Sequence, residues 1–174
     1  TAEYTGSAIR SLPVEGRLTV CNMSIEFSCK YGFVPADDVT LAYLAGREFA
    51  PRGTQWDAAV AHWRKLHSDD GAVFDKEVHV DCDALVPQVS WGTSPQQTVG
   101  IGQRVPDPSS APDAELRQLA DKALAYMQLQ PGMRLEGLRI DAAYIGSCTN
   151  ARLSDLREAA AILRGRKVHP GLQA

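Results

Sequence analysis

A cysteine set among small polar residues follows a short apolar run late in the sequence. The segment GSCTN, residues 146–150, lies between the apolar stretch 140–145 and a helix-like pattern that starts a few residues later. In open α/β sheets, ligands bind outside the carboxyl ends of the strands, where such a segment would lie. The free N–H groups in the first turn of the next helix favour thiolate over thiol. Cys148 is therefore predicted to bind a metal or to act as a nucleophile, and a small packed residue is the remaining alternative.

The other cysteines carry no ligand pattern. Cys21, Cys29 and Cys82 form no Cys-x-x-Cys pair, and their spacing suits neither a zinc site nor a disulfide framework. Cys21 shares the apolar face of a helix-like stretch, and Cys82 shares a face with the valines of a strand-like one. All three are expected to be structural.

The histidines offer little support for catalysis or metal binding. His62 and His67 lie five residues apart on one expected helix and so share no face, while His79 alternates with valines and is expected to face solvent. A cysteine hydrolase or acyltransferase would need a histidine base beside Cys148. His169 is the only histidine downstream, and no sequence feature pairs the two.

Hydrophobic periodicity predicts an α/β class in which helices cover a sheet. Each helix is marked by a run of apolar residues at helical spacing between turn signals, and each strand by alternation or by a short apolar run. The expected helices are two short ones between Glu3 and Phe27, one that starts in the Asp-rich stretch 35–38, runs through Leu44 and stops at Gly46, one from Thr54 to His67 with Trp56 and Trp63 in the core, one over 116–127, and one over 156–163 closed by Gly165.

Two strands and one long irregular segment complete the expected organisation. Residues 77–82 read as a half-buried strand and residues 140–145 as a buried one. The Pro- and Gly-rich stretch 87–112 is expected to be irregular around a short apolar element at 98–101, with Trp91 shaping a site or anchoring the loop. The whole chain, residues 1–174, is expected to form a single α/β region.

Composition limits the classes of function. The chain has 174 residues, 44% hydrophobic content and a formal net charge of −3, which suits one ordinary core. The charges are mixed along the sequence, so neither a nucleic acid nor an anionic membrane is indicated as a partner. No apolar run is long enough for a membrane span and no signal-peptide pattern starts the sequence. We therefore expect a cytoplasmic location.

Four strings give a resemblance to a known family. They are EGRLTVCNMSIEF (15–27), PQVSWGTSPQQ (87–97), YIGSCTNARLSDLREAA (144–160) and GRKVHPGLQA (165–174), in this order. Together they resemble the aconitase superfamily, and within it the large subunits of the 3-isopropylmalate dehydratases, or isopropylmalate isomerases, of leucine biosynthesis. Homoaconitase-like hydratases are the close alternative. The resemblance covers essentially all 174 residues and implies an aconitase-like fold with helices packed on a mainly parallel sheet.

The resemblance also implies an activity and a site. It implies a hydro-lyase that isomerises 2-isopropylmalate to 3-isopropylmalate by dehydration and rehydration. Cys148 matches one of three cysteines that hold a [4Fe–4S] cluster, whose open iron acts as a Lewis acid. Glu26 matches an active-site carboxylate, and Asn22 and Asn150 match polar residues close to the cluster.

The resemblance is incomplete, and this shapes the expectation for the chain. The family's other two cluster cysteines lie downstream of GSCTN, in a stretch that this sequence lacks. Several segments that bind substrate in the family are missing as well. We therefore expect an internal fragment of a larger subunit, inactive alone, with the cluster absent or incomplete. The implied partner is a separate small subunit that completes the substrate pocket.

Overall fold

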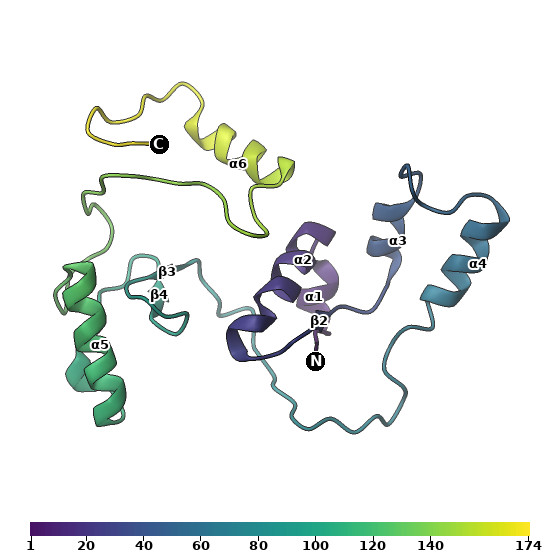
Figure 1. Cartoon of the computed structure of the whole chain (residues 1–174), viewed down its shortest axis with the longest axis horizontal. Helices are drawn as coiled ribbons and strands as arrows, with labels where there is room; N and C mark the ends of the chain where they lie inside the picture. Colours follow the sequence, from purple (N-terminus) through teal and green to yellow (C-terminus); the bar gives the residue numbers. More distant parts are fainter. The chain divides into compact units, whose positions relative to one another are not determined.

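The computed structural model describes all residues, 1–174, and Figure 1 labels its helices and strands. The chain divides into two compact units. The first comprises Thr1–His79 and Tyr144–Lys167, and the second comprises Val80–Ala143 and Val168–Ala174. The single α/β region expected over 1–174 stays a prediction. No helix in either unit has the length and apolar character that a membrane crossing requires.

Two short helices connect the two strands of a small parallel sheet in the first unit. Strand β1 (Ala2–Glu3) pairs with β2 (Gly32–Phe33), and between them run α1 (Ser7–Ser11) and α2 (Val14–Asn22). Helix α2 continues directly as the 3₁₀ helix η1 (Met23–Phe27). The prediction of two short helices before Phe27 is confirmed.

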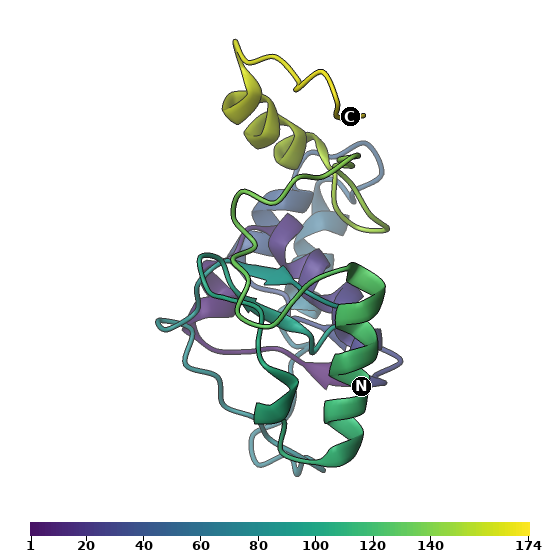
Figure 2. The same cartoon turned by 90° about the vertical axis from the view of Figure 1, so that its left-hand side faces the viewer.

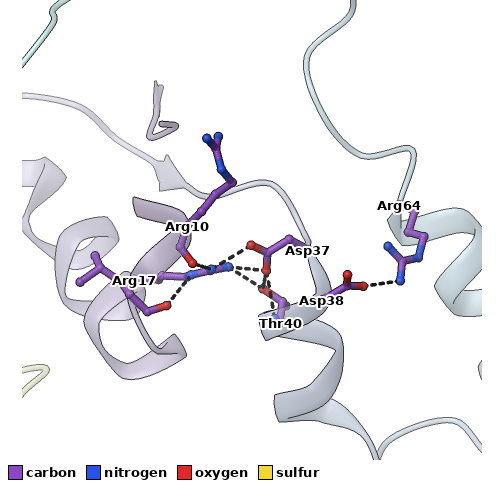
Figure 3. A network of polar contacts seen from close by, with 7 residues as sticks. Arg10, Arg17, Asp37, Asp38, Thr40 and Arg64 are labelled. Carbon is purple, nitrogen blue, oxygen red and sulfur yellow. Dashed lines mark hydrogen bonds and ion pairs between the residues drawn. The ribbon is translucent and has the colours of Figure 1, made fainter. Parts of the chain in front are cut away.

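A buried arginine fastens α2 to the following helix. The Arg17 side chain is only 4% exposed, and its guanidinium donates to both carboxylate oxygens of Asp37, at 2.6 and 2.8 Å (Figure 3). It also donates to Thr40 Oγ1 and to the carbonyls of Arg10 and Leu12, at 3.2, 2.9 and 3.1 Å. The Arg17 hydrogen bond is the main reason why the pKa of Asp37 is lowered to about 2. We call this set the Arg17 network.

Helices α3 (Asp38–Leu44) and α4 (Thr54–Trp63) follow in the first unit. Helix α3 begins where predicted, because the Asp37 carboxylate accepts the Thr40 N–H at 3.1 Å as an N-cap. Helix α4 is shorter than predicted and leaves His67 outside. The amides of Lys65 and Leu66 bond to carbonyls three residues back, which tightens and ends the helix. Trp56 and Trp63 stack edge to face at 5.9 Å but are only half-buried, so their placement in the core was wrong.

The strand expected over residues 77–82 is absent. Val78 and Val80 are 70% and 63% exposed, and the segment pairs with no other strand. Alternation only says which side chains would share a face, whereas a strand also needs a neighbour for its N–H and C=O groups. Cys82 is consequently exposed, and His79 faces solvent as expected.

The second unit is built on a hairpin and one long helix. Strands β3 (Gln88–Ser90) and β4 (Thr98–Gly100) pair antiparallel, and α5 (Ala114–Met127) packs nearby (Figure 2). The short 3₁₀ helix η2 (Pro108–Ser110) precedes α5. The stretch 87–112 is therefore more regular than predicted. The core of this unit consists of Trp91, Val105, Ala123 and Leu124.

Trp91 owes its burial to the turn that follows β3. The Trp91 amide donates to the Gln97 carbonyl at 2.9 Å, while Gln97 Oε1 accepts the amides of Thr93 and Ser94. This closes the SWGTSPQ loop so that the indole, 6% exposed, enters the core. Of the two roles considered for Trp91, anchoring the loop is the one seen here.

The strand expected over residues 140–145 is also absent. Only Ala142 makes an isolated parallel bridge, to Gln173, and Ile140 and Ile145 are 55% and 54% exposed. An apolar run is buried only where a partner covers it, and a single bridge does not cover this one. The chain nevertheless combines helices with paired strands, one pair parallel, and the predicted α/β class is confirmed.

Candidate functional site

Helix α2 carries a row of polar residues along the face opposite Arg17. Glu15, Thr19 and Asn22 are spaced by four and three residues, so they lie one above another on the helix, and Glu26 continues the spacing into η1. Arg17 lies two positions from Glu15 and Thr19, which places it about 160° away around a helix of 3.6 residues per turn. The same short helix therefore presents one face to the buried network and another to the segment that contains Cys148.

The cysteine segment leads into helix α6 (Leu153–Leu163). Cys148 is exposed and lies in an irregular stretch with two unusual backbone positions, Gly146 at φ 149° and Ala151 at φ 72°. The Arg152 amide donates to the Asp155 carboxylate at 3.0 Å, which satisfies one of the free N–H groups at the start of α6. The expected helix over 156–163 is confirmed.

Asn22 binds both Cys148 and the residue after it. Its Oδ1 accepts the Thr149 hydroxyl at 2.7 Å and the Cys148 thiol at 3.3 Å. An amide also has two N–H donors, so rotation of the Asn22 side chain would offer a donor to a thiolate at the same position. The structure thus brings together Asn22 and Cys148, which the sequence separates by 126 residues.

A second contact lies one turn earlier on α2. The Thr19 hydroxyl donates to Asn150 Oδ1 at 2.9 Å. Arg152 Nη1 donates to Thr19 Oγ1 at 3.2 Å and to the Glu15 carbonyl at 3.1 Å. Asn150 is therefore placed next to α2 as well, and three of the four residues that the resemblance selects gather at one contact.

Glu26, the fourth residue, is not part of this contact. It lies exposed on η1, one turn beyond Asn22, and its side chain makes no hydrogen bond or ion pair. Its carboxylate is free to meet solvent or a ligand. Nothing in the structure joins Glu26 to Cys148.

Sequence reasoning missed three residues of the contact. Thr19, Thr149 and Arg152 supply half of the side chains that join the cysteine segment to α2. A signal for Thr19 was present, because it lies three residues before Asn22 and therefore on the same helix face. No comparable signal identifies the partners of Thr149 and Arg152, since these depend on how distant segments meet.

The chain on its own does not fit a complete iron–sulfur site. Such a cluster needs several thiolates, and no group of three or more His, Cys, Asp or Glu side chains is arranged to hold a metal. Cys148 is the one thiol with polar residues gathered around it. Burial raises the pKa of the Cys21 thiol, which disfavours the thiolate there, and Cys29 is half-buried. Cys82 is exposed like Cys148, but its thiol contacts only the backbone carbonyl of Val80.

The comparisons with known proteins define the family. The aconitase family (aconitate hydratase) model matches residues 1–174. The chain therefore belongs to the aconitase family, and the resemblance inferred from its motifs is confirmed.

Three similar proteins carry names more specific than that of the family. The chain is 58% identical over 172 residues to the 3-isopropylmalate dehydratase large subunit of Cupriavidus necator. It is 51% identical over 172 residues to large subunit 1 of the same enzyme from Bradyrhizobium diazoefficiens, and 50% identical over 171 residues to the large subunit from Roseiflexus castenholzii. These matches cover 99%, 99% and 98% of this chain. The chain spans 64% of the first relative and 36% of each of the other two.

Proposed function

We propose that this chain is part of a hydro-lyase that converts 2-isopropylmalate into 3-isopropylmalate by removing and re-adding water, in leucine biosynthesis. Within it, Cys148 would provide one cysteine ligand of a [4Fe–4S] cluster, with Asn22 and Asn150 as its polar neighbours and Glu26 as a nearby carboxylate. The proposal includes a separate small subunit as partner, a small-molecule malate as substrate and a cytoplasmic location.

The contact between the cysteine segment and α2 carries the proposal. Cys148, Asn22 and Asn150 lie far apart in the sequence, yet hydrogen bonds bring all three to one place. An exposed thiol surrounded by amide and hydroxyl groups suits a ligand that must reach a metal and be oriented by outer hydrogen bonds. The relatives named as 3-isopropylmalate dehydratase large subunits support the choice of reaction.

The environment of Cys148 does not favour the nucleophile alternative. A cysteine nucleophile is activated by a neighbouring base, most often histidine. The hydrogen-bond partners of Cys148 are Asn22 and Thr149, and neither side chain can accept its proton as a base at neutral pH.

The first test concerns the ligand role of Cys148. The measurement is iron and acid-labile sulfide bound after anaerobic reconstitution of this chain, with Cys148→Ser and Cys82→Ser as matched variants of two exposed cysteines. We expect at most a weak, incomplete iron site that Cys148→Ser abolishes and Cys82→Ser leaves unchanged. A stable site that survives Cys148→Ser would contradict the ligand role.

The second test concerns the reaction. This chain would replace the matching 172 residues of the Bradyrhizobium diazoefficiens subunit, and the chimera would be assayed with that enzyme's small subunit. We expect isomerisation of 2-isopropylmalate, a loss of cluster with Cys148→Ser, and a large loss of rate with Glu26→Gln while the cluster is retained. A folded, cluster-containing chimera that acts only on a homoaconitase-type substrate would overturn the choice of substrate.

A further inference from the structure

Beyond the residues named so far as ligand and neighbours, we propose that Thr19 and Arg152 are positioning residues, which hold the Cys148 segment on α2 at a second point one helical turn from Asn22. The inference rests on the proposed function for its chemical purpose. Its structural content, a two-point attachment of the segment, can be tested without a cluster.

The first attachment point alone leaves the segment free to pivot. It consists of Asn22 Oδ1, which accepts from Cys148 and Thr149. Both donors lie next to each other in the chain, so they fix a position but leave an axis of rotation. A thiol also makes a weak hydrogen bond, so the Thr149 hydroxyl provides most of this attachment.

The second attachment point removes that freedom. The Thr19 hydroxyl accepts from Arg152 and donates to Asn150, so one side chain on α2 joins two residues of the segment. Arg152 reaches one turn further, to the Glu15 carbonyl. The Arg152 backbone N–H also donates a hydrogen bond to the Asp155 carboxylate at the start of α6, so the same residue ties the start of α6 to α2.

The backbone between the two points supports this geometry. Ala151 has φ 72°, a conformation that is costly for a residue with a Cβ, and it lies between Asn150 and Arg152. Such a conformation persists only where its surroundings hold it. The hydrogen bonds on either side of Ala151, both to Thr19, are the surroundings that do so here.

The test is the mobility of the segment in this chain, measured as backbone amide order parameters for residues 147–152. Thr19→Val removes the hydroxyl while keeping the shape, and Thr19→Ser restores it. Arg152→Met removes the guanidinium, and Arg157→Met is its matched control because Arg157, exposed on the same helix, makes no side-chain hydrogen bond or ion pair.

We expect the order parameters to fall from about 0.85 to below about 0.6 in Thr19→Val and in Arg152→Met, and to stay near the wild-type value in Thr19→Ser and Arg157→Met. Unchanged order parameters in both Thr19→Val and Arg152→Met would overturn the inference. Unfolding is detected separately, because it would also lower the order parameters throughout α2 and α3.

A second measurement addresses the chemical purpose and separates the two proposals. In the cluster-containing chimera, Thr19→Val should increase the rate of iron loss to a chelator by about fivefold, the effect of one ordinary hydrogen bond, and Thr19→Ser should not. If the segment loosens while Cys148→Ser leaves the cluster intact, the positioning role stands and the ligand role of Cys148 fails. If Cys148 is a ligand and the segment does not loosen, only the positioning role fails.

Discussion

Two polar networks use opposite faces of helix α2, and they differ in what they do for the molecule. The Arg17 network is buried at its centre and joins α2 to α3 through a bidentate ion pair between Arg17 and Asp37. The contact with the cysteine segment is largely exposed and consists of single hydrogen bonds. A buried charged group is costly to leave unpaired, whereas an exposed hydrogen bond can be exchanged for water. The first network should therefore determine stability, and the second should determine the position of one thiol.

Removal of the buried arginine should give the largest effect. Arg17→Met removes five hydrogen bonds and leaves the Asp37 carboxylate without its partner, so the free energy of unfolding should fall by about 3 kcal/mol. Urea unfolding measures the change, with Arg64→Met as the control, because Arg64 pairs with Asp38 in an exposed ion pair. A loss below about 1 kcal/mol, the value of an exposed pair, would remove the distinction between the two networks.

Acid should weaken the Arg17 network selectively. The pKa of Asp37 is lowered to about 2 in the folded chain, mainly by the Arg17 hydrogen bond, against an ordinary value of about 3.9. A lowered carboxyl pKa contributes stability that is fully present above the unfolded value and is lost as pH falls through the folded value. The contribution of Asp37 should therefore decline between about pH 4 and pH 2.

The check is the pH dependence of urea unfolding, compared with Asp37→Asn. Asparagine remains a good N-cap for α3, so this variant removes the charge and keeps the cap. The variant should be less stable at pH 6 and should lack the part of the acid slope that Asp37 provides. Parallel curves for the two proteins would show that Asp37 carries no such contribution.

In the exposed contact, a substitution should change the order of the cysteine segment more than the stability of the chain. Asn22→Ala removes the acceptor of Cys148 and Thr149, and we expect a change of no more than about 1 kcal/mol in the free energy of unfolding. The amide order parameters of residues 147–150 should fall clearly in the same variant. A destabilisation as large as that of Arg17→Met would mean that both faces of α2 are structural.

Features that depend on neighbouring residues could be predicted from the sequence, whereas contacts between distant segments could not. Local signals placed these helices well: the Asp-rich start before α3, the stop at Gly46 and the apolar spacing over 116–127 all correspond to observed features. The resemblance to the family selected Cys148, Asn22 and Asn150, and the structure brings these three residues to one contact. Both kinds of inference depend on residues that are close in sequence or on a pattern that is already known.

The failures depend on partners that no local pattern specifies. Residues 77–82 and 140–145 have the composition of strands, but nothing pairs with the first and a single bridge holds the second. The apolar residues of α2 suggested a buried face, yet the side chain buried from that helix is Arg17. A charged residue in such a position could be predicted only by knowing that Asp37 would lie opposite.

The smallest predicted effect separates stability from positioning within the cysteine segment itself. Ala151 has φ 72°, and glycine adopts this conformation without strain but has more freedom to lose on folding. Ala151→Gly should therefore raise the free energy of unfolding by about 0.5 kcal/mol, whereas the exposed helical control Ala160→Gly should lower it by about 1 kcal/mol. The order parameters around residue 151 should fall, because glycine permits other conformations between Asn150 and Arg152. Stability and order would then move in opposite directions at one residue, as expected if this face of α2 positions the thiol. If Ala151→Gly instead lowered both, the positive φ would be a favourable part of the fold and the two faces of α2 would be alike.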